Sequence, residues 1–412
     1  MAIVSQFVRL GGRLICRASI LGLTVLLVAV ALAGCSAGAA TTSPATRSTS
    51  RASAASSSTA SPTIAASPTP ESGFAQTGSM ASGRAQHTAT MLADGRVLIV
   101  GGRDANGRGI PSSELYDPKT GTFSPTGSLR TARYEHSATL LSDGRVLIVG
   151  GTEHSCTTGC DAPSVLASAE LYDPKTGVFT PTGSMALPHR GPTATLLSDG
   201  RVLFTGGRPG LPSAELYDPT TGKFTATGSM STERLFPAAT LLPDGRVLIT
   251  GGDDGTAAVA SAELYDPSTG AFSRTASMGA ARWGHSATLL SDGRVLVAGG
   301  RGNIGALLGL SSAELYDTKA GTFSPTGSMV KGLVGQKAVL LLDGRVLIIA
   351  GFDQSSPLAE LYDPKTGTFS ATSSMVDHRF DFTATLLADG RVLVTGGTDN
   401  GDLLASAELY QP

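Results

Sequence analysis

The sequence predicts an all-β protein, a seven-bladed β-propeller with four antiparallel strands in each blade. The first observation is a stretch reading Asp-Gly-Arg-Val-Leu, which begins at Asp94, Asp143, Asp199, Asp244, Asp292, Asp343 and Asp389. The second is a set of four short β-like runs around each copy. The third is the glycine content, 52 of 412 residues, which favours turns over helices. Four strands repeated about every 40–50 residues are the pattern of propeller blades.

The repeat has a rigid frame and one variable segment. Neighbouring Asp-Gly-Arg copies are separated by 49, 56, 45, 48, 51 and 46 residues. The segment between each Gly-Gly and the next Ser-Ala-Glu-Leu-Tyr-like stretch holds 9, 16, 5, 8, 11 and 6 residues, and removing it leaves 40 in every interval. All length variation therefore falls in one loop of each unit.

The second unit shows the four expected strands at residues 136–141, 145–151, 168–173 and 178–183. Asp-Gly joins the first two runs, and both residues tolerate the positive φ of a tight hairpin. The turn cluster Asp-Pro-Lys-Thr-Gly joins the last two. These nearly invariant turns occupy one face of the propeller, and the variable loops occupy the other. We therefore expect binding residues on the face of the variable loops.

At these residues the chain resembles the kelch family. The matching motif reads Arg-x-x-His-Ser-Ala-Thr-Leu-Leu-x-Asp-Gly-Arg-Val-Leu, then Gly-Gly, then Ala-Glu-Leu-Tyr-Asp-Pro, then an aromatic residue and Gly-Ser-Met, and it covers residues 74–412. The resemblance implies that Gly-Gly ends the second strand and that Phe replaces the more usual Trp of the fourth. The sixth unit departs from the motif, since residues 333–341 contain neither the Arg nor the His.

The two ends of the repeat region predict how the ring closes. Residues 74–80 read Phe-Ala-Gln-Thr-Gly-Ser-Met, the tail of a unit with no unit before it, whereas residues 406–412 end a unit that lacks its tail. An open ring would leave two sheet edges unpaired. We therefore expect residues 74–80 to supply the outer strand of the last blade, so that the N-terminal strand closes the propeller.

Residues 1–34 read as a lipoprotein signal peptide. Three arginines precede an apolar run at 20–34, and Leu-Ala-Gly-Cys at 32–35 resembles the lipobox of bacterial lipoproteins. The resemblance implies cleavage before Cys35 and lipid attachment to its thiol; the alternatives are an uncleaved anchor or an ordinary signal peptide. Residues 35–73 follow as a disordered tether of Ser, Thr, Ala and Pro. We expect an exported protein, lipid-anchored to a bacterial membrane and facing the periplasm or the cell exterior.

Charge and cysteine content narrow the possible partners. A net charge of −2 gives no basic footprint for nucleic acid, so no nucleic-acid partner is expected. Cys156 and Cys160 lie in the longest variable loop, where an exported protein is expected to form a disulfide. A metal site with His154 and Asp161 is the alternative, but this set is sparse for a zinc motif. The sequence therefore predicts neither a metal nor a cofactor.

One position, ten residues before each Asp-Gly-Arg aspartate, is rich in arginine: Arg84, Arg133, His189, Arg234, Arg282, Leu333 and Arg379. Three of the next residues are aromatic: Tyr134, Trp283 and Phe380. Arginines around the mouth of the central channel would bind carboxylate, sulfate or phosphate groups, and the aromatic rings would stack on a sugar or peptide. The alternative is that these arginines belong to the motif and hydrogen-bond the backbone of the blades.

Two further residue types recur too regularly to act once in catalysis. A glutamate occupies the third strand of every unit: Glu114, Glu170, Glu215, Glu263, Glu314, Glu360 and Glu408. We expect these glutamates to meet buried partners, with arginines as candidates. His87, His136 and His285 are interpreted as hydrogen-bonding residues at strand starts rather than as ligands.

The sequence as a whole favours a binding function. We expect a monomeric, membrane-anchored module that presents its variable face to a protein or an acidic glycan. The alternative is a carbohydrate-active enzyme like the kelch-type sialic acid epimerases. A copper oxidase like galactose oxidase is disfavoured, since every tyrosine except Tyr134 belongs to a repeated Glu-Leu-Tyr stretch. Fold alone does not decide between these functions.

Overall fold

The computed structural model describes residues 72–154, 164–207, 212–302, 309–349, 351 and 358–412. These residues fall within one compact unit, 67–412. The signal peptide, Cys35, the tether as far as residue 71 and the Cys156–Cys160 pair lie outside the described residues. In the part of the chain that is described, no helix is long and apolar enough to cross a membrane.

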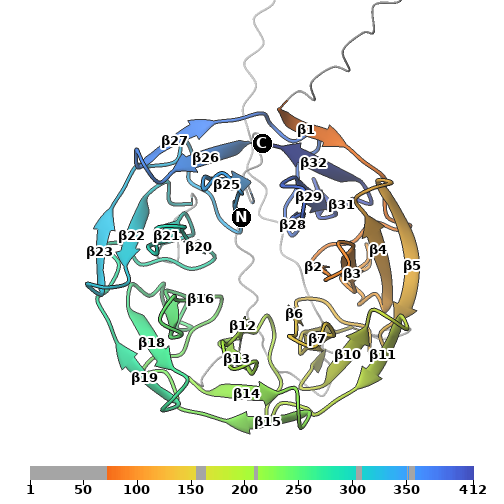
Figure 1. The fold of residues 1–412 in the computed structure, drawn as a ribbon, viewed down its shortest axis with the longest axis horizontal. Coiled ribbons are helices and arrows are strands. Elements are labelled where there is room, and N and C mark those ends of the chain that lie inside the picture. The colour runs from red at the N-terminus through yellow and green to blue at the C-terminus, as the bar shows by residue number, and fades with distance from the viewer. Residues whose placement is uncertain (1–71, 155–163, 208–211, 303–308, 350, 352–357) are drawn as a thin grey trace, which may run out of the picture. The chain divides into compact units, whose positions relative to one another are not determined.

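Seven four-stranded antiparallel sheets surround a common axis (Figure 1). Blade 1 contains β2 (Thr88–Met91), β3 (Val97–Val100), β4 (Ser112–Asp117) and β5 (Thr122–Ser128). Blade 2 contains β6 (Ser137–Leu140), β7 (Val146–Val149), β10 (Ala169–Asp173) and β11 (Val178–Pro181). Blade 3 contains β12 (Thr193–Leu196), β13 (Val202–Thr205), β14 (Ala214–Asp218) and β15 (Lys223–Ala226).

The next three blades repeat this order from the axis outward. Blade 4 contains β16 (Ala238–Leu241), β17 (Val247–Thr250), β18 (Ala262–Asp266) and β19 (Ala271–Arg274). Blade 5 contains β20 (Ser286–Leu289), β21 (Val295–Ala298), β22 (Ala313–Asp317) and β23 (Thr322–Pro325). Blade 6 contains β24 (Lys337–Leu340), β25 (Val346–Ile349), β26 (Ala359–Asp363) and β27 (Thr368–Ala371).

Blade 7 confirms the predicted closure. It contains β28 (Thr383–Leu386), β29 (Val392–Thr395), β32 (Ala407–Gln411) and, from the other end of the repeat region, β1 (Gly73–Gln76). Strand β1 pairs antiparallel with β32, with Gly73 opposite Gln411 and Gln76 opposite Glu408. Segments more than 300 residues apart in sequence thus share one sheet, and blade 7 has no missing outer strand.

The core lies in the joints between neighbouring blades. Every residue of the second strand of each blade is buried, because its Val, Leu and Ile side chains pack against both adjacent blades. At the joint of blades 1 and 2, for example, Val100 and Ile148 belong to one apolar cluster. Burying such side chains contributes about 1.5–3 kcal/mol each. The apolar run of the second strand, rather than strict alternation, therefore matches a strand covered on both faces.

Aromatic residues complete each joint nearer the rim. The third-strand tyrosine packs against the fourth-strand phenylalanine of the same blade, as in Tyr116 and Phe123 with ring centroids 4.9 Å apart. The Tyr116 hydroxyl and Thr77 Oγ1, from the preceding blade, are hydrogen-bonded at 3.0 Å. Equivalent Thr–Tyr hydrogen bonds occur at the other six joints. The recurring Tyr, Phe and Thr thus connect the outer parts of the blades.

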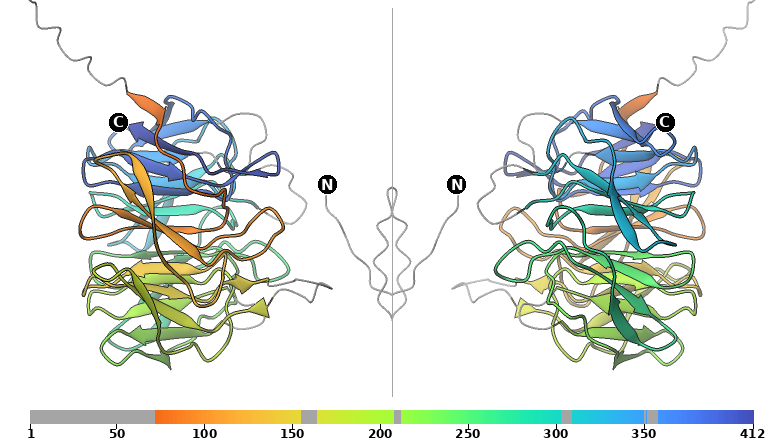
Figure 2. Two further views of the ribbon diagram at one scale, coloured as in Figure 1. Left: turned by 90° about the vertical axis from the view of Figure 1, so that its right-hand side faces the viewer. Right: turned by 90° about the vertical axis from the view of Figure 1, so that its left-hand side faces the viewer.

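The two faces of the propeller differ. On the turn face, each Asp-Gly-Arg turn holds a partly exposed ion pair such as Arg96–Asp94, and shallow hollows recur between neighbouring blades with the same kinds of residues around them. On the loop face, the hairpins β8–β9 (Thr152–Glu153, Ser164–Val165) and β30–β31 (Thr398–Asp399, Asp402–Leu403) project outward (Figure 2). Repetition marks the turn face as structural, whereas the loop face differs from blade to blade.

Candidate functional site

The recurring arginines lie inside the blades. Arg84 precedes β2, and its Nη1 donates hydrogen bonds to the carbonyls of Gly101 and Ser112, each at 3.0 Å. Its Nη2 donates to Ser112 Oγ at 3.2 Å and to Glu114 Oε1 at 2.9 Å. Arginines at this position in five blades make the same set of contacts and are at most 1% exposed: Arg84, Arg133, Arg234, Arg282 and Arg379.

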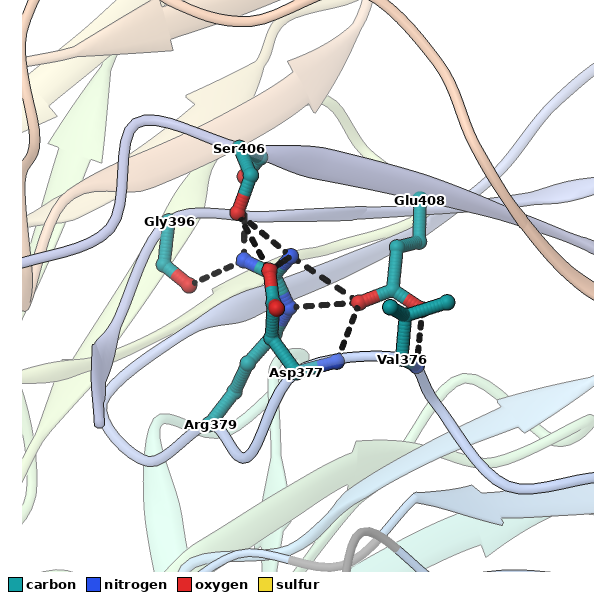
Figure 3. A network of polar contacts seen from close by, with 6 residues as sticks. All are labelled: Val376, Asp377, Arg379, Gly396, Ser406 and Glu408. Carbon is teal, nitrogen blue, oxygen red and sulfur yellow. Dashed lines mark hydrogen bonds and ion pairs between the residues drawn. The ribbon is translucent and has the colours of Figure 1, made fainter. Parts of the chain in front are cut away.

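Figure 3 shows this cluster in blade 7, where three parts of the chain enclose Arg379. Its Nη1 donates to the Gly396 carbonyl at 2.9 Å, and its Nη2 donates to Ser406 Oγ at 2.8 Å and to Glu408 Oε1 at 2.9 Å. Asp377 adds a second carboxylate, with Oδ2 at 2.9 Å from Nη2. A buried charge is tolerated when it is paired and hydrogen-bonded in this way.

The buried glutamates hold the other side of each cluster. Glu170 accepts hydrogen bonds from the backbone amides of Arg130 at 2.9 Å and Thr131 at 3.2 Å, and both amides lie in the segment that links blade 1 to blade 2. In the five blades with an arginine, the expectation that the glutamate meets a buried arginine is confirmed. Each Arg–Glu pair fastens a linking segment to the blade that follows it.

This burial decides which role the five arginines have in the fold. Their terminal nitrogens already bond to carbonyls, a serine and a glutamate, and their side chains do not reach the surface. They therefore do not present guanidinium groups to a ligand at the channel mouth. The motif interpretation, in which these arginines hydrogen-bond the blades, describes the contacts in the structure.

Blades 3 and 6 carry other residues at the arginine position, and these residues make different contacts. His189 of blade 3 makes one of the contacts that the arginine makes in other blades, since its Nδ1 lies 2.8 Å from the Gly206 carbonyl. Leu333 of blade 6 is 1% exposed and joins an apolar cluster instead. Glu360 consequently has only backbone donors, such as the Val330 amide at 3.1 Å, and burial raises the pKa of this carboxyl. Blade 6 thus departs from the scaffold pattern most strongly.

The three motif histidines are buried connectors between blades. The ring Nε2 atoms of His87, His136 and His285 lie within 3.0 Å of a threonine hydroxyl of the preceding blade: Thr395, Thr88 and Thr250 respectively. Burial, assisted by the charge of Arg133, lowers the pKa of His136 to about 3, and burial lowers that of His285 to about 3. These rings are neutral hydrogen-bonding groups in the scaffold.

A ring of seven residues surrounds the mouth of the channel on the loop face, each two positions after the arginine or its replacement. We call it the mouth ring, and all its members adopt positive φ: Gln86, Glu135, Gly191, Phe236, Gly284, Gly335 and Asp381. Backbone hydrogen bonds link consecutive members, as from the Gln86 amide to the Asp381 carbonyl at 2.9 Å and from the Glu135 amide to the Gln86 carbonyl at 3.0 Å. Four members are not glycine, although this conformation favours glycine, and such strain concentrates at functional sites.

One side of the mouth is polar. Gln86 Nε2 donates to Glu135 Oε1 at 3.0 Å, and Arg103 Nε donates to Gln86 Oε1 at 2.9 Å. Arg103 also lies 3.8 Å from the Asp381 carboxylate, and Arg190 pairs with Glu135. Burial raises the pKa of Asp381, while the charges of Arg103 and Lys337 oppose that shift. We call Gln86, Arg103, Glu135, Arg190 and Asp381 the polar arc; it spans blades 7, 1, 2 and 3.

The other side of the mouth is apolar. The rings of Phe236 and Trp283 have centroids 6.0 Å apart, and Phe236 is 44% exposed. Glycines leave space beside these side chains. A Cβ atom at Gly191 would contact the Phe236 ring, and one at Gly284 would contact Val334. We call Phe236, Trp283 and Val334 the apolar arc, which spans blades 4, 5 and 6. An exposed aromatic pair opposite a polar network is typical of a ligand-binding surface.

The structure separates the three aromatic residues that follow arginines in the sequence. Trp283 is partly exposed in the apolar arc, whereas Tyr134 is 8% exposed and bridges to Thr152 at the base of hairpin β8–β9. Phe380 is half-buried and bridges to Thr398 of hairpin β30–β31. The three do not form one stacking surface, because each pairs with the residue that follows Gly-Gly in its own blade.

Sequence reasoning missed the mouth ring and its polar partners. A signal was present, because glycine alternates with Gln, Glu, Phe and Asp at this position of the repeat, as expected where the backbone requires positive φ. Arg190 gave no comparable signal, since it occurs in a single blade, and Arg103 shares its repeat position with Arg208 and Arg301 but also with Thr152, Asp253 and Thr398. The importance of Arg103 and Arg190 appears only when the fold brings them beside Glu135 and Asp381.

Comparisons with known proteins agree with this architecture. Residues 234–279 match the kelch motif. A fungal alcohol oxidase of the AA5 family, in complex with copper, matches with a TM-score of 0.66 and 18% identity over 82% of this chain and 75% of that one. YjhT matches with a TM-score of 0.55 and 13% identity over 71% of this chain and 99% of that one. No curated protein matches. The chain is thus a seven-bladed β-propeller that carries a kelch motif at residues 234–279.

Proposed function

We propose that the protein is an exported lipoprotein whose propeller binds a ligand at the channel mouth. One observation carries this proposal: seven positions with the same backbone conformation hold different residues, from Gly284 to Phe236 and Asp381, whereas the buried positions two residues earlier are nearly uniform. A scaffold needs the same contact in every blade. Variation at equivalent, at least partly exposed positions, combined with backbone strain, favours recognition.

The chemistry of the mouth favours a ligand with polar and apolar sides, such as a sugar or a peptide segment. Hydroxyl, amide or acidic groups would face Gln86, Arg103 and Arg190, and an apolar ring face or side chain would lie on Trp283 and Phe236. In this proposal the ligand contacts residues of the mouth instead of the buried arginines. The expected partner is still a protein or an acidic glycan.

The binding proposal can be tested with glycan and protein arrays probed with residues 72–412. Once a ligand is found, Trp283→Ala and Arg190→Ala should each weaken binding about tenfold or more, the usual effect of losing one aromatic or charged contact. The matched control is Arg294→Ala, because Arg294 lies in an exposed ion pair on the turn face. Equal affinities for all four proteins would exclude the mouth as the site.

The membrane anchor is a separate part of the proposal, supported by Leu-Ala-Gly-Cys at residues 32–35. The full-length protein should partition into the detergent phase, and Cys35→Ala should abolish this partitioning. Normal processing and anchoring of the Cys35→Ala protein would show that Cys35 does not carry the lipid.

A catalytic alternative rests on Asp381, whose raised pKa and place beside Arg103 are those of a possible general acid. If the protein epimerises a sugar, Asp381→Asn should abolish exchange of the reacting proton while binding persists. The residues present do not fit a copper centre: seven tyrosines bond to threonines in the joints, and no three His, Cys, Asp or Glu side chains gather within the described ranges.

A further inference from the structure

The innermost strands carry small or apolar side chains and no charge except at one residue. They line the axis, and most of their residues are partly exposed, so solvent reaches an axial channel. Six of the seven read Thr-Ala-Thr-Met, Ser-Ala-Thr-Leu, Thr-Ala-Thr-Leu or Ala-Ala-Thr-Leu, and β24 reads Lys-Ala-Val-Leu. Lys337 is therefore the single charged residue among the 28 that form these strands. It replaces a small side chain in the blade that departs most from the motif.

Lys337 lies on the innermost strand of blade 6, close in sequence to the mouth ring. The residue lies two positions after Gly335 of the mouth ring, at the start of β24. Its charge acts on Asp381 of blade 7 and on His87 of blade 1, two blades away. The charge of Lys337 is therefore within electrostatic range of the polar arc.

Lys337 has no direct partner among the described residues. No side-chain hydrogen bond or ion pair reaches its amine, whereas Arg103 pairs with Asp381 and Arg190 pairs with Glu135. Burial lowers the pKa of Lys337, and Asp381 opposes this shift only from a distance. The two arginines of the polar arc are thus matched by two carboxylates, and Lys337 supplies one positive charge in excess.

We propose that Lys337 is the anchor for a carboxylate group of the ligand, which enters the channel through the mouth. This inference rests on the proposed binding function and specifies the chemistry at its centre. One unmatched positive charge suits a singly charged carboxylate, since a doubly charged phosphate would leave a negative excess beside Asp381 and Glu135. The carboxylate could belong to a sugar acid or to an acidic amino acid, and the two sources share this contact.

A functional role predicts an unusual effect on stability. An amine that is partly buried without a partner costs folding free energy, so removing its charge should not destabilise the propeller. Lys337→Met keeps the length of the side chain and removes the charge. We expect its melting temperature to equal or exceed that of the natural protein. A fall of several degrees would assign Lys337 to the scaffold and overturn the proposal.

Binding can be measured by NMR on protein labelled with ¹³C at the lysine ε-carbons, with the Lys337 signal assigned by its absence in Lys337→Met. The probes are galacturonate with galactose as its neutral match, and N-acetylglutamate with N-acetylglutamine, at constant ionic strength. We expect a saturable shift of the Lys337 signal with at least one acid and with neither neutral compound. Galacturonate or N-acetylglutamate alone would identify a sugar or an amino-acid source.

Two variants separate this inference from the binding function itself. Lys337→Met should weaken binding of the effective acid about tenfold or more, and Lys337→Arg should retain most of it. Lys365→Met is the matched control, since Lys365 lies in the exposed turn of the same blade. If Trp283→Ala abolishes binding of an array ligand while Lys337→Met does not, the mouth binds without Lys337. If no acid shifts the Lys337 signal, the carboxylate site does not exist.

Discussion

The buried arginine position and the mouth ring are two residues apart in sequence and differ in every physical respect. Arg133 is inaccessible to solvent and bonded to Glu170, and the same cluster recurs in four other blades. Glu135 is partly buried, adopts a left-handed conformation and pairs with the exposed Arg190, a residue that occurs in one blade only. The difference teaches that in a repeat protein the conspicuous charged residue is the structural one.

The comparison also explains why five arginines suggested a binding ring. Their regular spacing does place them at one level around the axis, but the guanidinium groups turn into the blades, where carbonyls and a glutamate satisfy them. The proposed binding site depends on departures from the repeat, which occur in the mouth ring and at Lys337. The following experiments either break this division between scaffold and site or make it sharper.

Removing the closing strand should have the largest effect. A protein lacking residues 36–80 loses β1, so the edge of β32 is unpaired and Phe74 no longer packs on Tyr410. We expect unfolding or aggregation. A protein lacking residues 36–72 keeps β1 and should melt at nearly the temperature of the full-length protein, as measured by circular dichroism. Equal melting temperatures for the two truncations would contradict closure by β1.

Acid should weaken the scaffold through its buried histidines. Their pKa values are lowered in the folded state, to about 3 for His136 and His285, so the unfolded chain binds protons first as the pH falls. Their contribution is complete above the unfolded pKa of about 6.5 and is lost toward pH 3, at about 1.4 kcal/mol per pH unit for each histidine. Urea unfolding between pH 6.5 and 4.5 should show this loss.

The control for the acid prediction comes from blade 6, which carries Gln336 at the histidine position. Gln336 Nε2 donates to the Ala298 carbonyl at 2.6 Å, so glutamine can connect blades without titrating. Replacing His136 and His285 by glutamine should reduce the pH dependence over this range to the part that His87 contributes. If the natural protein already shows constant stability, the buried histidines are not neutral connectors.

Phe236→Gly should change the free energy of unfolding only slightly, because it removes a favourable contact and an unfavourable backbone conformation together. Phe236→Gly removes a ring contact with Trp283, worth about 0.5–1.5 kcal/mol, but also relieves a positive φ that costs a non-glycine residue roughly 1 kcal/mol or more. The free energy of unfolding should change by less than about 1 kcal/mol in urea titrations. Loss of several kcal/mol would place Phe236 in the scaffold.

Much of the fold could be predicted from the sequence, because its causes are local and repeated. Seven copies of one frame specify strand order, and the unmatched tail at residues 74–80 predicts closure through a pairing that the structure contains. The site could not be predicted in the same way. Whether Arg282 points into the blade or the channel depends on where Glu314 and the Gly299 carbonyl lie, and these are distant in sequence.

The contacts at the channel mouth could not be predicted from the sequence either. Asp381 and Arg103 are nearly 280 residues apart and meet only because blade 7 closes against blade 1. Lys337 could have been singled out, since a lysine interrupts a pattern of Thr, Ala and Leu, but its electrostatic influence on Asp381 and His87 becomes visible only in the assembled ring. Repetition therefore predicts a scaffold, and contacts between different blades define a site.

The central claim is tested most directly by comparing Arg282→Ala with Trp283→Ala, two neighbouring residues on opposite sides of the division. Arg282→Ala leaves Glu314 buried without its cation and should lower the free energy of unfolding by about 3–5 kcal/mol. Trp283→Ala trims a partly exposed side chain and should cost about 1 kcal/mol. Urea unfolding of both proteins measures the two values. A stable Arg282→Ala protein beside an unfolded Trp283→Ala protein would contradict the account.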